Sequence, residues 1–110
     1  DALSPGDRLK MEAARSIRED FLHQNSFHET DTYTSLKKQY MMMKLVNAFY
    51  DRASAALSQG ASLQKLISMP VREQIGRFKY VREDDLDEEY RRTDENLSVQ
   101  TANAFVKEER

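Results

Sequence analysis

The chain has 110 residues, of which 39% are hydrophobic and 33% are charged, and its mean hydropathy is −0.80, which is typical of a helical domain with a charged exterior. The net charge of −2 is unevenly distributed: residues 1–81 carry 12 basic and 9 acidic side chains, and residues 82–95 carry 3 and 8. This distribution argues against a nucleic-acid binder, which would show a basic face with interleaved aromatic side chains.

The first predicted helix runs over residues 5–23. Ser4 is a good helix cap, Pro5 suits the first helical position, and the carboxylate of Asp7 is favoured at the positive end of the helix dipole. The apolar row of the helix has i, i+4 spacing and consists of Leu9, Ala13, Ile17 and Phe21. Such a row packs against another helix, so this helix alone is half of a packed unit.

Residues 24–34 form a predicted polar loop, in which Phe27 is an aromatic side chain alone among Asn25, Ser26, His28 and Glu29 and belongs to neither flanking helical stripe. An aromatic side chain in this setting either fills a gap in a neighbouring element or contacts a ligand.

The second predicted helix covers residues 35–59 and ends at Gly60. It carries two adjacent stripes, which predicts contacts on two sides and a central place in a bundle. The first stripe is Leu36, Tyr40, Met43, Asn47, Tyr50, Ser54 and Leu57, and the second is Met42, Leu45, Val46, Phe49, Ala53 and Ala56.

Short helices are predicted on both sides of Pro70. Ser62 caps the first short helix, and Pro70 ends it. Pro70 also begins the second short helix, which covers residues 71–80. Gly76 is a weak or closely packed point within this second helix. A charged hinge at residues 82–85 leads into a final helix over residues 85–107 on the bundle surface. Its expected i, i+4 ion pairs are Asp87 with Arg91 and Glu88 with Arg92, and its thin apolar stripe is Leu86, Tyr90, Leu97, Ala104 and Phe105.

The predicted fold is therefore all-α: a bundle of four to five helices with two long central helices, short helices around Pro70 and a charged C-terminal helix. We divide it into a helical bundle at residues 1–81 and the charged helix at residues 82–110. No apolar run approaches the roughly 20 residues that span a bilayer, and the first residues do not have the pattern of a secretory leader, so we expect neither membrane insertion nor secretion. The absence of an initiating methionine predicts a processed or excised piece.

The motifs of common catalytic sites are missing from the sequence. There is no cysteine, no GxxxxGK[ST] and no GxGxxG, so we expect neither a thiolate site nor a phosphate-binding loop. A metal-dependent enzyme would have to use His23, His28 and Glu29, which lack an HExxH pattern. The acidic run at residues 83–89 lacks the alternating ligands of a calcium loop and is typical of a solvated helix start.

Three segments carry a resemblance to a known family: ARSIREDFLHQNSFHETDTY from Ala14, KQYMMMKLVNAFYD from Lys38, and LISMPVREQIGRFKY from Leu66. Together they resemble the C-terminal region of the catalytic A subunit, or alpha chain, of archaeal and vacuolar-type rotary ATPases. The resemblance covers residues 1–80. It implies a C-terminal helical bundle whose nucleotide-binding domain lies upstream, so that ATP or ADP with Mg²⁺ binds in the full subunit and none is expected in this piece.

Two sites are implied by this resemblance. Asn25, Ser26 and Phe27 are similar in position to a Gln-Pro-Phe element of the F-type catalytic subunit, which makes Phe27 the candidate adenine contact; packing of Phe27 inside the bundle or on the missing domain is the alternative. The stretch from Asp1 to Asp7 is similar in place to the DELSEED lever loop of F-type enzymes, which meets the rotor. The implied rotor-contact residues are Leu3, Ser4, Pro5, Gly6 and Asp7.

This lever loop departs from the F-type pattern, because Ala2, Pro5 and Gly6 stand where that pattern has glutamates. The departure favours contact by shape over contact by charge. The first helix would then be the returning half of a helical hairpin whose outgoing half precedes the chain.

The resemblance implies a transmission role, in which closure of the nucleotide domain moves this bundle against the central stalk and couples ATP synthesis or hydrolysis to rotation and ion transport. The implied partners are the non-catalytic B subunit, the central stalk subunits and the upstream domain, on the cytoplasmic side of a membrane complex. The rival hypotheses are a stand-alone helical protein-interaction module and, more remotely, the metal-dependent enzyme.

Overall fold

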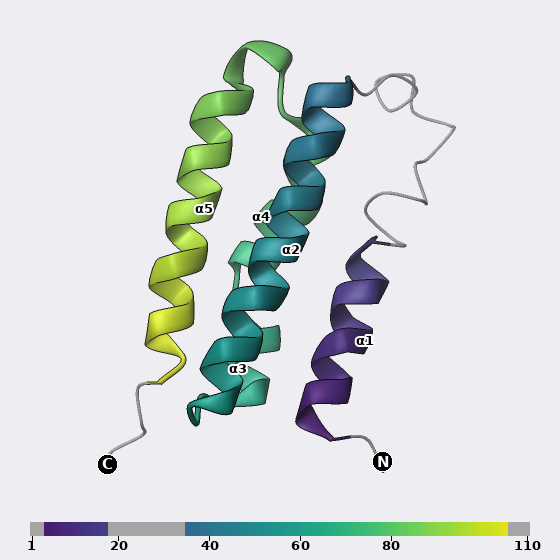
Figure 1. The fold of residues 1–110 in the computed structure, drawn as a ribbon. Helices are drawn as coiled ribbons and strands as arrows, with labels where there is room; N and C mark the ends of the chain where they lie inside the picture. The colour runs from purple at the N-terminus through teal and green to yellow at the C-terminus, as the bar shows by residue number, and fades with distance from the viewer. Residues whose placement is uncertain (1–3, 18–34, 106–110) are drawn as a thin grey trace.

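The computed structural model describes residues 4–17 and 35–105, and Figure 1 shows their arrangement. Within these two ranges the chain forms helices and no strand, which confirms the predicted all-α fold. The long helices are α1 (Pro5–Ile17), α2 (Leu36–Ser58) and α5 (Leu86–Asn103). The short helices α3 (Leu63–Ile67) and α4 (Val71–Gly76) and the 3-10 turns η3 (Arg77–Tyr80) and η4 (Glu83–Asp85) connect α2 to α5.

The boundaries of α2 follow from local capping. At its start the Ser35 Oγ accepts a hydrogen bond from the Lys38 N–H at 3.0 Å. At its end Gly60 adopts a positive φ of 107°. The Gly60 N–H donates to the Leu57 carbonyl at 3.1 Å and the Ala61 N–H donates to the Ala56 carbonyl at 2.9 Å. This pair of bonds is the Schellman motif, so the predicted glycine stop is confirmed.

The core lies between α2 and the helices around it. The most deeply buried side chains come from all of α1 to α5 and from η3, and they are Phe49, Phe78, Leu9, Met42, Leu45, Leu66, Leu86, Leu97, Val71 and Thr93. All six members of the second predicted stripe of α2 are buried. Burial of these apolar surfaces is the main force that holds the helices together.

The first predicted stripe of α2 behaves differently from the expectation. Leu36 is 82% exposed, Tyr40 65% and Met43 38%, so the N-terminal half of this stripe faces outward. Only Tyr50 and Leu57, further along the helix, pack partly against the core. The prediction of two buried sides therefore holds for the C-terminal half of α2 and not for its beginning.

The helix predicted over residues 71–80 changes its geometry part of the way along. It is α-helical as far as Gly76 and continues as the 3-10 turn η3. Glycine is among the poorest helix formers, and 3-10 turns are common at helix ends, so the position that the sequence marked as weak is where the helix tightens. Phe78 in η3 nevertheless reaches the core, with no exposed surface.

α5 packs along α2 and α4, and its buried stripe differs from the one predicted. Leu86, Leu97 and Ala104 are buried as expected, but Phe105 is 38% exposed. Thr93 and Thr101 are buried in addition. The Thr93 hydroxyl donates to the Glu89 carbonyl at 2.8 Å, which gives its buried O–H a partner and lets a polar residue occupy a core position.

Candidate functional site

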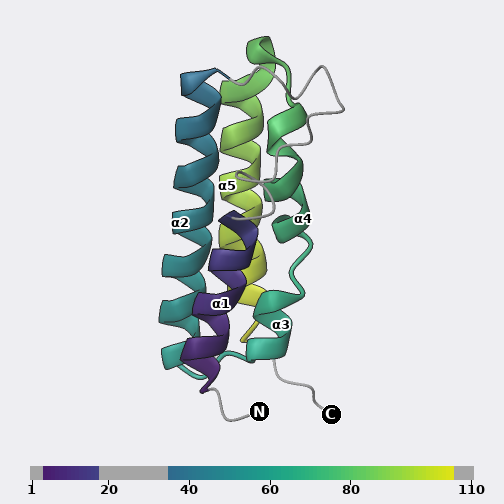
Figure 2. The ribbon, with the colours of Figure 1, turned by 90° about the vertical axis from the view of Figure 1, so that its right-hand side faces the viewer.

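The N-terminal end of α1, at residues 4–7, is the part of the predicted rotor contact that the structure describes. The Asp7 N–H donates to the Ser4 Oγ at 3.1 Å, and the Arg8 N–H donates to the Ser4 carbonyl at 2.9 Å. Ser4 therefore caps the helix, as predicted. All four residues of this end are exposed, and in Figures 1 and 2 it lies at the same end of the bundle as α3.

α1 packs on α2 through the described part of the predicted apolar row, and Phe21, the last member of that row, lies outside the described residues. Leu9 has no exposed surface, Ala13 is 9% exposed, and Ile17 packs partly against the core. Within the described residues α2 is therefore the partner of this row. The opposite flank of α1 stays exposed at Met11 and Ala14, with Met11 57% exposed.

A polar contact fastens α1 to the short helices. Arg72 on α4 donates from Nη1 to the Glu12 Oε1 at 2.9 Å and from Nη2 to the Ser16 Oγ at 3.1 Å. The side chains of Arg72 and Glu12 are only 20% and 18% exposed. The sequence did not reveal this contact, since its partners are separated by 60 and 56 residues and neither belongs to a local pattern.

A second contact missed by the sequence joins α2 to η3. Lys38 is 7% exposed, and its Nζ donates to the Lys79 carbonyl at 2.9 Å. Lysine is rarely this buried unless its ammonium has a partner. Here the partner is a main-chain carbonyl of η3, so Lys38 holds the 3-10 turn on the central helix.

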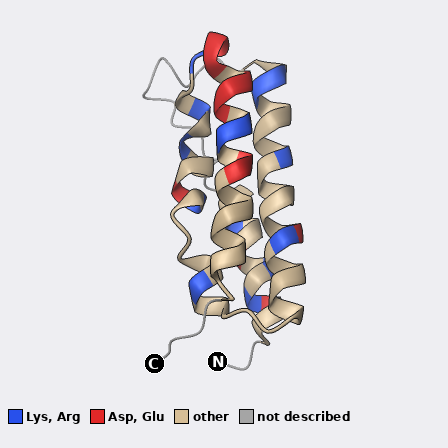
Figure 3. Ribbon diagram, turned by 90° about the vertical axis from the view of Figure 1, so that its left-hand side faces the viewer, with Lys and Arg blue, Asp and Glu red and all other residues tan. Residues whose placement is uncertain are grey.

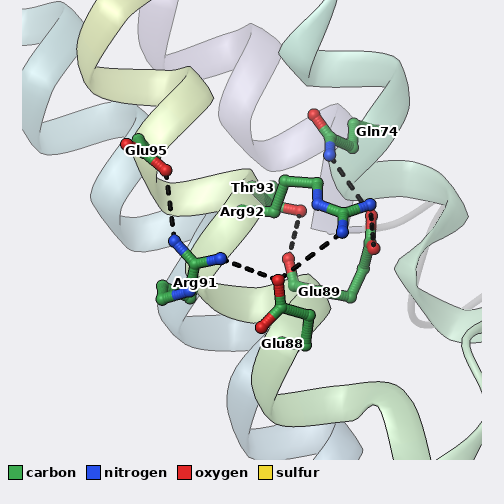
Figure 4. A network of polar contacts seen from close by, with 7 residues as sticks. All are labelled: Gln74, Glu88, Glu89, Arg91, Arg92, Thr93 and Glu95. Carbon is green, nitrogen blue, oxygen red and sulfur yellow. Dashed lines mark hydrogen bonds and ion pairs between the residues drawn. The ribbon is translucent and has the colours of Figure 1, made fainter.

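The first turns of α5 form an exposed ladder of charges, drawn in Figure 4. Arg91 pairs with Glu88 at 2.7 Å and with Glu95 at 3.3 Å. The hydrogen bond from Arg91 lowers the pKa of Glu88 below its ordinary value, and the same bond raises the pKa of Arg91. Glu88 also meets Arg92 at 3.5 Å, as the sequence predicted.

Asp87 pairs across helices and not within α5. Its carboxylate lies 3.2 Å from the Lys37 Nζ of α2, so the predicted pairing with Arg91 is wrong. Figure 3 shows the acidic beginning of α5 at one end of the bundle, opposite the end where α1 begins (Figure 1). The acidic beginning of α5 and the exposed beginning of α1 therefore cannot form one site.

The part of the chain that the structure describes contains no cluster of three or more acidic or histidine side chains suited to hold a metal ion. Nor does any of the described helices combine the length and the apolar character that crossing a bilayer requires. His23, His28 and Glu29, on which the metal hypothesis depends, lie outside the described residues, as do the candidate adenine contact Phe27 and the first rotor-contact residue, Leu3.

Comparison with known proteins relates the chain to one family. Residues 1–67 match the family model described as the C-terminal domain of V and A type ATP synthase. The V-type ATP synthase alpha chain of Acetivibrio thermocellus is 53% identical over 108 residues, which are 98% of this chain and 18% of that protein. The corresponding alpha chain of Clostridioides difficile is 51% identical over 107 residues, or 97% of this chain and 18% of that protein.

A third alpha chain, from Thermoanaerobacter pseudethanolicus, is 58% identical over 86 residues, or 78% of this chain and 15% of that protein. The similarity to the first two relatives continues through α5, past the limit of residue 80 set by the sequence segments. The chain spans less than a fifth of the length of these relatives. By the matched model and by this identity, the chain belongs to the V and A type ATP synthase family, as its C-terminal domain.

Proposed function

We propose that this chain serves as the C-terminal domain of an alpha chain in a V-type ATP synthase, where it passes motion between a nucleotide-binding domain and a rotating central stalk. The observation that carries the proposal is the 53% identity over 108 residues to an alpha chain of such an enzyme. The helical bundle supports it, because packed helices move as rigid bodies and so transmit displacement.

In this role the domain takes no part in bond breaking. ATP or ADP with Mg²⁺ is bound by the upstream part of the alpha chain, and the non-catalytic B subunit and the stalk subunits are the neighbouring proteins. The assembly stands on the cytoplasmic side of its membrane sector. The resemblance described above supports each of these assignments.

The rotor contact is proposed at Leu3, Ser4, Pro5, Gly6 and Asp7. The exposed and capped end of α1 supports this assignment, since α1 is anchored further along, at Leu9 and Ala13, and presents its first turn to the outside. Asp7 is the one charged side chain among residues 3–7, so contact by shape is expected to outweigh contact by charge.

The rotor contact is tested by replacing residues 3–7 with a Gly-Ser stretch of equal length in the full alpha chain of the assembled synthase. The number of ions transported per ATP hydrolysed should fall, whereas the affinity for nucleotide should not change. Met11→Ala is the matched control, because Met11 is an exposed residue of the same helix away from this end. An unchanged ion-to-ATP ratio in the Gly-Ser variant would refute the rotor contact.

The adenine contact of Phe27 is tested separately. Stacking of a base on an aromatic ring contributes about 1–3 kcal/mol, so Phe27→Ala in the full alpha chain should raise the Kd for ATP by about 5- to 160-fold. Phe105→Ala is the control, since it removes the same side chain near the end of α5. Unchanged ATP binding would remove Phe27 from the nucleotide site and favour its packing inside the protein.

A further inference from the structure

We infer that Arg72 is a positioning residue for α1, which it fixes through Glu12 and Ser16 so that the exposed end of that helix moves as one body with α2, α3 and α4. The consequence for rotation rests on the proposed function. The contact itself rests on the geometry of described residues.

The side chain of Arg72 links its own helix to three others. It starts from α4, reaches Glu12 and Ser16 on α1, and donates from Nη1 to the Ile67 carbonyl at the end of α3 at 3.1 Å. Its guanidinium carbon also lies over the Phe49 ring of α2, 5.2 Å from the ring centroid. An arginine suits this place because its planar group offers five donors in a fixed geometry and stacks on aromatic rings.

The apolar contacts of α1 are few. Leu9 and Ala13 are buried on this helix, Ile17 packs partly against the core, and Ala13 offers a single methyl group. Hydrophobic contact is non-directional, so it restricts rotation and sliding of the helix less sharply than directional bonds do. Hydrogen bonds to a fixed guanidinium have preferred directions, and they restrict both movements.

The two residues of α1 that accept hydrogen bonds from the Arg72 side chain lie one turn apart. Glu12 and Ser16 have i, i+4 spacing, so they share a face of α1 beside its apolar row. Asp7 lies five positions before Glu12, which is about 7.5 Å along the helix axis. A rotation of α1 at the Arg72 contact would therefore redirect the side chains of the proposed rotor contact.

The ion pair between Arg72 and Glu12 is less exposed than the ion pairs on α5. Arg72 and Glu12 are 20% and 18% exposed, whereas Arg91 and Glu88 are 63% and 56% exposed. Water and salt weaken the exposed pairs, and such pairs contribute little to the placement of a helix. The Arg72–Glu12 pair is better shielded from water and salt, and loss of Glu12 would leave the Arg72 guanidinium without its carboxylate partner. Glu12 itself also pairs with Arg15, at 3.6 Å.

The test uses the full alpha chain in the assembled synthase, with the conservative variants Glu12→Gln and Arg72→Lys. Glu12→Gln keeps the shape of the side chain and a hydrogen-bond acceptor but removes the negative charge. Arg72→Lys keeps the positive charge but removes the planar guanidinium group with its several N–H donors. Arg91→Lys is the matched control on the exposed surface of α5. The first readout is the distance distribution between spin labels attached at Arg8→Cys on α1 and Val99→Cys on α5, two exposed positions.

Both variants should broaden or shift this distance distribution and lower the number of ions transported per ATP, with an unchanged Kd for nucleotide. The control should leave all three at their wild-type values. The double variant should be no worse than the more severe single variant, because both act on one contact. Wild-type distances in the Glu12→Gln and Arg72→Lys complexes would overturn the inference.

The Gly-Ser variant of residues 3–7 separates the failure of this inference from that of the proposed function. If that variant lowers the ion-to-ATP ratio and the Arg72→Lys variant changes neither the distances nor the ratio, the positioning role is wrong and the rotor contact stands. If the Arg72→Lys distances broaden but neither variant changes the ratio, Arg72 positions α1 as inferred and the rotor contact is refuted.

Discussion

Replacement of Leu97 by alanine tests whether the charged helix α5 belongs to the same cooperative unit as the rest of the bundle. Leu97 is fully buried. Loss of three buried carbon atoms removes about 2.4 kcal/mol of transfer free energy, at about 0.8 kcal/mol each. With the cavity that remains, the free energy of unfolding should fall by about 3–4 kcal/mol. Single domains have a free energy of unfolding of only about 5–15 kcal/mol, so this loss is a large one.

The assay is urea denaturation followed by far-ultraviolet circular dichroism. With an m-value of about 1.5 kcal/mol per M, the urea midpoint of Leu97→Ala should fall by about 2 M. Val99→Ala is the control, since Val99 is two positions away on the same helix and 54% exposed. Its free energy of unfolding should change by no more than about 0.5 kcal/mol.

Equal midpoints for the Leu97→Ala and Val99→Ala variants would refute the reasoning. That result would mean that α5 is not part of the cooperative core, and it would favour the division at residue 82 that charge and pattern suggested. Two separate transitions in the wild-type chain would lead to the same conclusion.

Two further predictions concern a glycine and a surface carboxylate. Gly60→Ala should lower the free energy of unfolding by about 1–2 kcal/mol in thermal denaturation, because Gly60 has a φ of 107°. Gly6 lies in a helical turn, and the nearest atom to a Cβ added there is the Ser4 Oγ at 4.0 Å. Gly6→Ala should therefore be neutral or stabilise the fold by up to about 1 kcal/mol. Equal losses of stability in both glycine variants would contradict the backbone argument. Because Arg91 lowers the pKa of Glu88 in the folded state, the stability from this pair should be present above the ordinary glutamate pKa and be lost as the pH falls through the folded value. In an NMR titration Arg91→Gln should raise the pKa of Glu88 and Arg82→Gln should not, and an unmoved Glu88 pKa in Arg91→Gln would show that the ion pair is not formed in solution.

Much of the fold could be predicted from local patterns. Ser4, Ser35 and Ser62 cap their helices because a hydroxyl next to a free N–H is a short-range event, readable within four residues. Gly60 ends α2 for a similarly local reason. The buried stripe of α2 was predictable because a period of 3.6 residues places its members on one side of the helix.

Two predictions failed where the presence or the absence of a neighbouring helix decided the outcome. Asp87 was expected to pair within α5, but Lys37 on α2 lies closer to it. The first stripe of α2 was expected to be buried along its whole length, but Leu36 and Tyr40 face outward. In each case the pattern describes one helix correctly. It does not show whether another helix lies beside a given residue of that helix.

By itself the sequence determined that the chain is helical, where α2 ends, where the short helices begin, which side of α2 is buried, and to which family the chain is similar. Only the tertiary structure decided that α1 packs on α2, that Thr93 belongs to the core, and that Arg72 joins four helices. The physical reason is range: capping and periodicity act over a few residues, whereas the contacts of Arg72 with Glu12 and of Lys38 with Lys79 join positions 60 and 41 residues apart. Such contacts exist only once the helices have packed.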